Sequence, residues 1–171
     1  MRTLILGGIG SGKTSLALRL ALSAPSPRIF VATAEATDSE MVAKIERHRR
    51  ERGEAFLTVE EPLELPEVLG KVSGNTVVVD CLTVWLGNLL HYGKDPLKYF
   101  ESLFGVLEGF EGRLFLVSNE VGFAPVPADP LTRLYVNLLG KLHQGLSKRC
   151  EEVLLVVAGQ ILPLKPAGVG R

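Results

Sequence analysis

Two hydrophobic patterns alternate along this chain and predict its secondary structure. Short runs that are apolar at nearly every position are typical of strands buried on both faces, and apolar residues spaced three or four apart are typical of helices. Strands are expected at 3–6, 28–32, 56–59, 76–80, 114–118 and 153–157, with a short strand or a tail at 161–165. Helices are expected at 15–24, 37–52, 63–72, 83–91, 96–110 and 131–149. This alternation predicts an α/β fold in which helices cover both faces of a mostly parallel central sheet.

Length, composition and charge narrow the class of protein. At 171 residues the chain is most simply one domain, residues 1–171, and its 46% hydrophobic content suits a globular core. The formal net charge is zero, so nothing global indicates a nucleic-acid or membrane partner. No apolar run approaches the roughly 18 residues of a membrane span, and no signal peptide precedes the first strand. Two cysteines in apolar surroundings, Cys81 and Cys150, fit a reduced, cytoplasmic protein.

The stretch between the first strand and the first helix carries the clearest chemical motif. It fits G-x-x-x-x-G-K-[ST] with the residues Gly7, Gly8, Ile9, Gly10, Ser11, Gly12, Lys13 and Thr14. A strand before it and a helix after it are the context that a phosphate-binding loop (P-loop) requires. Lys13 would reach the β- and γ-phosphates of a nucleotide, and the Thr14 hydroxyl would bind Mg²⁺. The alternative is a glycine-rich turn that binds nothing, but the complete motif in this context predicts a nucleoside-triphosphate site.

Acidic and polar residues follow several predicted strands, at the edge where open α/β sheets bind ligands. Asp80 ends an apolar strand in the manner of a Walker B acid, which predicts a metal role shared with Thr14. Its alternative role is to cap the next helix. Thr33, Ala34 and Glu35 follow the second strand, and Glu60 follows the third. Asn119 and Glu120 follow the fifth strand, where Glu120 is a candidate second carboxylate. Cys81 and Trp85 are expected to pack in the core.

The predicted helix at 37–52 combines a histidine with several arginines. Its spacing places Met41, Ile45, His48 and Arg52 on one face, which must turn toward the body of the protein. An imidazole with several guanidinium groups could then meet the phosphates of a nucleotide at the ligand edge. The residues alone favour the alternative, a solvated charged face with a structural histidine.

Together these motifs resemble one family through most of the chain. The matching stretches are 7–14, 32–34, 40–41, 45–49, 59–62, 79–86, 117–122 and 126–127. They are similar to the bifunctional adenosylcobinamide kinase / adenosylcobinamide-phosphate guanylyltransferase of cobalamin biosynthesis. The resemblance implies a RecA-like P-loop NTPase fold, a homotrimer, Mg²⁺, and GTP or ATP as substrates. It departs at Val136 and Asn137, where Arg-Asp is expected, and at His143, where Asn is usual, which bears on acceptor binding or subunit contacts.

The resemblance implies two reactions and the residues that perform them. A nucleoside triphosphate phosphorylates the side-arm hydroxyl of adenosylcobinamide, and GMP from GTP then passes through a guanylyl-histidine to adenosylcobinamide phosphate, giving adenosylcobinamide-GDP. The catalytic residues would be His48 and Lys13, and the metal ligands Thr14 and Asp80. Nucleotide contacts beyond the phosphate loop would come from Thr33, Ala34, Glu35, Arg49, Arg50, Glu51, Arg52, Glu60 and Asp80.

Two other functions also fit the residues. A simple P-loop small-molecule kinase would transfer the γ-phosphoryl group without any covalent histidine chemistry. A RecA-like ATPase or nucleic-acid-binding module would use the basic run at 47–52 as its footprint. Zero net charge with only three tyrosines and one tryptophan disfavours a nucleic-acid partner.

Overall fold

The computed structural model describes residues 1–35 and 53–167, which form one continuous sheet and its covering helices. The elements are β1 (Arg2–Gly7), α1 (Lys13–Leu22), β2 (Arg28–Ala32), the 3₁₀ turn η1 (Gly53–Ala55), β3 (Leu57–Glu60), α3 (Leu65–Lys71), β4 (Thr76–Asp80), α4 (Leu82–His91), α5 (Pro96–Glu108), β5 (Arg113–Asn119), α6 (Pro130–Arg149), β6 (Glu152–Val157) and β7 (Gln160–Lys165). Each lies within two residues of a predicted element, apart from η1, which was not predicted. The predicted helix at 37–52 lies outside the described residues.

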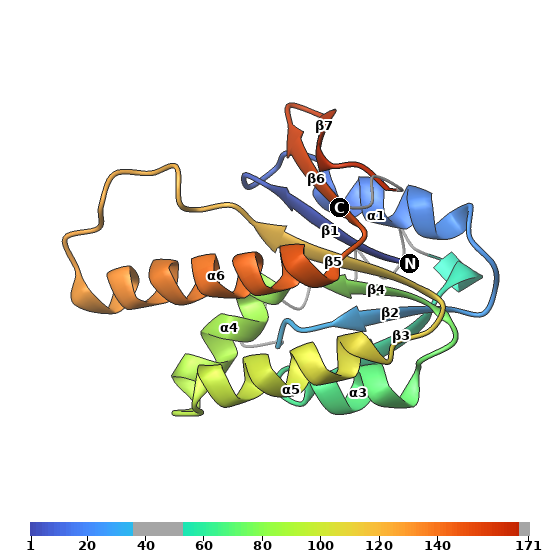
Figure 1. The fold of residues 1–171 in the computed structure, drawn as a ribbon, viewed down its shortest axis with the longest axis horizontal. Helices are drawn as coiled ribbons and strands as arrows, with labels where there is room; N and C mark the ends of the chain where they lie inside the picture. Colours follow the sequence, from blue (N-terminus) through green and yellow to red (C-terminus); the bar gives the residue numbers. More distant parts are fainter. Residues whose placement is uncertain (36–52, 168–171) are drawn as a thin grey trace.

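The sheet is mostly parallel, as the alternating pattern predicted. Its strand order is β3-β2-β4-β5-β1-β6-β7, with β1 between β5 and β6 (Figure 1). Every pairing is parallel except that of β6 with β7, which form an antiparallel hairpin. Residues 161–165, for which the sequence allowed either a short strand or a tail, therefore belong to the edge strand β7. Parallel pairing brings the carboxyl ends of β1, β2, β4 and β5 to one edge of the sheet.

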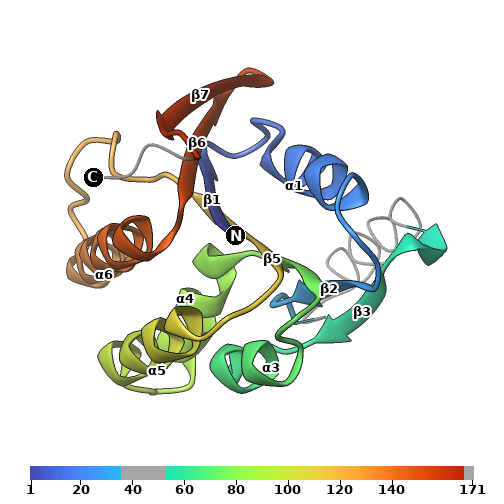
Figure 2. The same ribbon diagram turned by 45° about the vertical axis from the view of Figure 1, so that its right-hand side comes forward.

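Alternation along the strands divides the core into two layers. Leu4 and Leu6 face one side, where they pack with residues of α3, α4, α5 and α6, while Ile5 faces the side covered by α1 (Figure 2). Trp85 of α4 is fully buried in the first layer, where its indole N–H donates to the Leu63 carbonyl at 2.8 Å. Both faces of the sheet are thus covered by helices, and the core role predicted for Trp85 is confirmed.

Helix α6 owes its start to local chemistry. The Asp129 carboxylate accepts the Thr132 N–H at 2.7 Å, and Pro130 occupies the first position, where no backbone donor is needed. The capping hydrogen bonds hold the pKa of Asp129 below its ordinary value. The proline-containing segment before it, 123–129, forms neither helix nor strand. It projects from the same end of the sheet as the loop after β1 (Figure 1).

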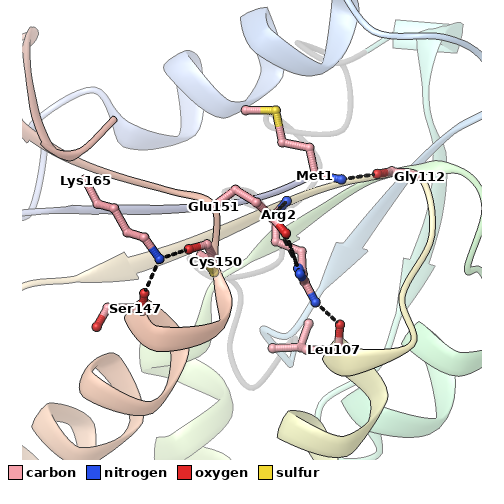
Figure 3. A network of polar contacts seen from close by, with 8 residues as sticks. All are labelled: Met1, Arg2, Leu107, Gly112, Ser147, Cys150, Glu151 and Lys165. Atoms are coloured by element: carbon pink, nitrogen blue, oxygen red, sulfur yellow. Dashed lines mark hydrogen bonds and ion pairs between the residues drawn. The ribbon is translucent and has the colours of Figure 1, made fainter. Parts of the chain in front are cut away.

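A polar network ties the chain together at the opposite end of the sheet (Figure 3). Arg2 at the start of β1 pairs with Glu151, which immediately precedes β6, and donates to the Leu107 carbonyl near the end of α5. Partial burial alone would raise the pKa of Glu151, but the Arg2 hydrogen bonds outweigh it and lower that pKa to about 2. Lys165 of β7 donates to the carbonyls of Ser147 and Cys150. These contacts anchor β1, β7, α5 and α6 at the end of the sheet away from the carboxyl edge.

Within the described residues, no helix combines the length and apolar character needed to cross a bilayer.

Candidate active site

The phosphate loop joins β1 to α1 at the carboxyl edge of the sheet, in the strand–loop–helix context that its sequence predicted. Gly10 and Gly12 have φ values of 70° and 100°, which residues with a Cβ adopt only under strain. At Gly7 the limit is space, because an added Cβ would lie 2.3 Å from the carbonyl oxygen of Val156 in β6. The loop therefore depends on glycine for two separate reasons.

The Lys13 side chain is folded back into this loop. Its Nζ donates to the Gly8 carbonyl at 2.6 Å and lies 3.5 Å from Ser11 Oγ. Burial lowers the pKa of Lys13, while the nearby Asp80 carboxylate opposes that shift. A nucleotide phosphate could replace the Gly8 carbonyl as the hydrogen-bond acceptor of Lys13, because its negative charge would offset the desolvation of the ammonium group. The ammonium group of Lys13 therefore already lies inside the phosphate loop, where the motif predicts the phosphates to bind.

Thr14 and Asp80 meet although they lie 66 positions apart in the chain. The Thr14 hydroxyl donates to Asp80 Oδ2 at 2.8 Å, from the first turn of α1 to the end of β4. A hydroxyl and a carboxylate are the hard oxygen ligands that Mg²⁺ prefers, and Mg²⁺ usually takes only one or two such groups besides substrate phosphates. The pair fits the metal ion predicted from the sequence.

Thr33 fixes the backbone that follows Asp80. Its hydroxyl accepts the Cys81 N–H at 2.9 Å and donates to the Cys81 carbonyl at 2.8 Å, and its own N–H donates to the Asp80 carbonyl at 3.2 Å. The Thr33 carbonyl accepts the side-chain amide of Asn88 at 2.8 Å. Thr33 is fully buried, and its side chain holds the backbone of Cys81, the residue that follows Asp80. Asn88 was not predicted as a site residue from the sequence. The only signal for it there is its place on α4, on the same face as the residues three and four positions away.

The remaining predicted residues of the described chain gather along the same edge. Ala32 pairs in register with both Glu60 and Asp80, so the two acids flank β2 in one row. Glu60 is exposed, Ala34 is half-buried, and Glu35 accepts a hydrogen bond from the Tyr92 hydroxyl at 3.0 Å.

The carboxylate of Glu120 faces protein groups from both of its oxygens. Oε1 accepts the Gly122 N–H, and Oε2 lies 3.7 Å from Nδ1 of His143. The Glu120 N–H donates to the Gly7 carbonyl at 2.9 Å, because Asn119 and Gly7 are register partners in β5 and β1. The backbone of Glu120 therefore helps to hold the start of the phosphate loop in place. Sequence reasoning marked His143 only as a departure from the family.

Five predicted site residues lie outside the described residues: His48, Arg49, Arg50, Glu51 and Arg52. They remain predictions.

Comparison with known proteins gives concordant matches at two levels. The family described as cobinamide kinase / cobinamide phosphate guanyltransferase matches residues 3–164. A bifunctional adenosylcobalamin biosynthesis protein of Pseudomonas aeruginosa, CobP, is 45% identical over 170 residues, covering 96% of this chain and 98% of the relative. The Escherichia coli protein of the same description, CobU, is 35% identical over 176 residues, with 93% and 97% coverage.

Solved structures agree on the fold alone. The RadB recombinase gives a TM-score of 0.52 at 20% identity over 90% of this chain and 72% of its own. The P4 protein from bacteriophage phi6 in complex with ADP gives 0.55 at 16% identity over 99% and 55%. Both comparisons support a RecA-like P-loop NTPase architecture, and the sequence relatives go further. The chain belongs to the cobinamide kinase / cobinamide phosphate guanyltransferase family.

Proposed function

We propose that this protein phosphorylates adenosylcobinamide with GTP or ATP and then transfers GMP from GTP to the resulting phosphate, giving adenosylcobinamide-GDP. The observation that carries the proposal is the family match over residues 3–164, in which the loop lysine, Thr14 and Asp80 meet at one edge. The two reactions break different bonds of a nucleoside triphosphate, since the first moves the γ-phosphoryl group of GTP or ATP and the second moves the α-phosphoryl group of GTP as GMP.

In the kinase step, the side-arm hydroxyl oxygen attacks the γ-phosphorus and the bond to the β-phosphate oxygen breaks, so that the nucleoside diphosphate leaves and the hydroxyl proton passes to solvent. Lys13 would leave the Gly8 carbonyl and bind the β- and γ-phosphates, and its partial desolvation strengthens that attraction. Thr14 and Asp80 would hold Mg²⁺, which when bound neutralises charge on the two phosphates. The backbone N–H groups of the loop and the start of α1 add further positive potential.

In the guanylyl step, we assign the nucleophile to His48 on the strength of the family resemblance. Its neutral imidazole forms a bond to the α-phosphorus while the bond to pyrophosphate breaks. An oxygen of the corrinoid phosphate then attacks the same phosphorus, so that the P–N bond breaks and the imidazole is restored. Arg49, Arg50 and Arg52 would offset phosphate charge, with Glu51 in the same segment. Ala34, Glu35 and Glu60 complete the nucleotide-binding edge in this proposal, and the fully buried Thr33, predicted as a nucleotide contact, supports that edge through the backbone of Cys81.

A homotrimer in the cytoplasm is also part of the proposal. The resemblance supports the trimer, and the two free cysteines, Cys81 and Cys150, suit a reducing compartment.

A plain small-molecule kinase is the second candidate, because the phosphate loop, Thr14 and Asp80 would serve it equally well. Incubation with GTP labelled at the α-phosphate, followed by denaturing electrophoresis, separates the two. The bifunctional enzyme should give a labelled band that is labile in acid and stable in alkali, as a P–N bond is. His48→Ala should abolish the band, while His91→Ala, at an exposed position on α4, should retain it. An unlabelled wild-type protein with intact γ-phosphoryl transfer would favour the plain kinase.

A further inference from the structure

A buried hydroxyl at the end of β5 joins three elements beside the phosphate loop. Ser118 is fully buried and pairs in register with Leu6. Its Oγ lies 2.7 Å from Nε2 of His143 on α6 and 3.3 Å from Oγ1 of Thr83 on α4. Polar groups buried this deeply are stable only when each donor has an acceptor and each acceptor a donor.

One consistent direction satisfies the donors and acceptors of these hydrogen bonds. Thr83 Oγ1 accepts the backbone N–H of Asn119 at 2.7 Å, and its hydroxyl proton can be donated to Ser118 Oγ at 3.3 Å. Ser118 can then donate to Nε2 of a neutral His143 whose proton sits on Nδ1, facing Glu120 Oε2 at 3.7 Å. The other neutral tautomer would turn the Nδ1 lone pair toward a carboxylate. Burial lowers the pKa of His143, although Glu120 opposes the shift, so burial favours the neutral form.

The resulting chain, which we call the relay, comprises Thr83, Ser118 and His143. It starts at the backbone of Asn119 and ends at the carboxylate of the next residue, Glu120. Both of these residues border the phosphate loop, since Asn119 pairs with Gly7 and the Glu120 N–H holds the Gly7 carbonyl. The relay therefore sets the position of the segment that lies against the start of the loop.

Strand alternation indicates where the side chain of Asn119 lies. Phe115 and Val117 pack on the α1 side of the sheet, in the same layer as Leu16, whereas Ser118 faces α6. Asn119 is the last residue of β5 and is half-buried, so its carboxamide belongs to the α1 side. Lys13 and Thr14 begin α1 on that side. A carboxamide N–H there can donate to a phosphate oxygen.

We propose that Asn119 contacts the γ-phosphate of the bound nucleotide, and that His143 is a positioning residue which acts on Asn119 through Ser118 and Thr83. This inference rests on the proposed nucleotide-dependent kinase and adds to it a phosphate contact and its support.

The test compares the affinities of the variants for GTP and GDP by titration calorimetry, using the full-length protein. A γ-phosphate contact predicts that Asn119→Ala weakens GTP binding about tenfold and leaves GDP binding unchanged. His143→Leu and Ser118→Ala should each reduce the preference for GTP severalfold. The double variant should be no worse than the more affected single variant, because both changes break the same relay.

Two further variants separate positioning from folding. His143→Gln can present an amide oxygen near the place of Nε2 and should restore most of the preference for GTP. Gln144→Ala, at an exposed position on the same helix, serves as the control and should match the wild type. Melting temperatures recorded for every variant identify effects of lost stability.

The proposal is overturned if Asn119→Ala keeps the wild-type ratio of GTP to GDP affinity. It is also overturned if the effects of Ser118→Ala and His143→Leu multiply in the double variant, or if His143→Gln behaves like His143→Leu. Failure of the proposed function has a different signature, namely a wild-type protein that binds GTP but does not phosphorylate adenosylcobinamide. In that case the affinity ratios still decide the role of Asn119.

Discussion

Replacing Gly7 by alanine should damage the protein at the start of its phosphate loop. The new Cβ would lie 2.3 Å from the Val156 carbonyl oxygen and 2.7 Å from Ser11 Oγ. Real Cβ atoms essentially never approach within 3.0 Å, so the first contact must open by at least 3.0 − 2.3 = 0.7 Å. Val156 is buried and is the register partner of Gly7 in the neighbouring strand, so β1 and β6 would have to separate locally.

The cost can be placed on the scale of other overpacked sites. Forcing one extra carbon into a packed region typically costs about 1–3 kcal/mol. For a domain of this size each kcal/mol lowers the melting temperature by roughly 2–4 °C, so a loss of about 4–8 °C is expected for a mid-range cost. Nucleotide affinity should fall as well, because the loop is also fixed to the β6–β7 turn by the Gly159 N–H, which donates to the Ser11 carbonyl at 3.0 Å.

Gly8→Ala is the matched control for thermal stability. It lies one position along the same loop, where an added Cβ meets nothing within 4 Å. Thermal unfolding of both variants is measured without and with GTP. Without nucleotide, the melting temperature of Gly7→Ala should be clearly lowered, and that of Gly8→Ala should change little. Equal melting temperatures for the two nucleotide-free variants would refute the argument from close packing.

Three other perturbations test separate parts of the structure. Asp80→Asn should shift the Mg²⁺ titration of phosphoryl transfer to higher concentrations more than it weakens metal-free nucleotide binding; an unchanged titration would limit Asp80 to a structural role. On α6, Gly145→Ala should destabilise the fold by about 1–3 kcal/mol, because its Cβ would lie 2.2 Å from an aromatic ring of α5, whereas Gly140→Ala, with nothing within 4 Å, should stabilise it by about 0.5–1 kcal/mol. Chemical denaturation measures both, and equal signs would contradict the packing argument. The Arg2–Glu151 pair should stabilise the fold by about 1 kcal/mol after solvent screening, fully above pH 4.5 and progressively less as the pH falls toward 2, because the pKa of Glu151 is lowered on folding. Denaturation of Glu151→Gln against the wild type should show that difference shrinking with acid, and a constant difference would exclude the linkage.

Local patterns made most of the fold predictable from the sequence. The phosphate loop is encoded by eight consecutive residues and their flanking elements, so no long-range information is needed to locate it. The apolar strands likewise predicted a parallel sheet. Asp80, the acid at the end of one of them, was predicted to share a metal ion with Thr14, and the structure places the two side chains within hydrogen-bond distance. Strand order was not predicted, because apolar strands of similar length do not identify their neighbours.

The supporting contacts of the site could not be read from the sequence. Thr33 carries the polar side chain expected of a ligand contact, yet its hydroxyl is bonded to Cys81, 48 positions away. Likewise His143 and Ser118 lie 25 positions apart, and only the packing of α6 against the end of β5 brings them together. Such pairs depend on register and on helix placement, which a periodic pattern does not define.

The most direct test of the account follows γ- and α-phosphorus labels into the corrinoid product. Purified protein, adenosylcobinamide and Mg²⁺ are incubated with GTP and ATP that both carry the label at the γ-phosphate or, in a parallel reaction, with GTP labelled at the α-phosphate and unlabelled ATP. The account predicts that both labels enter the corrinoid: the γ-label by phosphorylation, and the α-label as GMP attached to that phosphate, with one pyrophosphate released per GMP transferred. Entry of the γ-label alone would contradict the guanylyltransferase activity, and entry of neither label would contradict the proposed function as a whole.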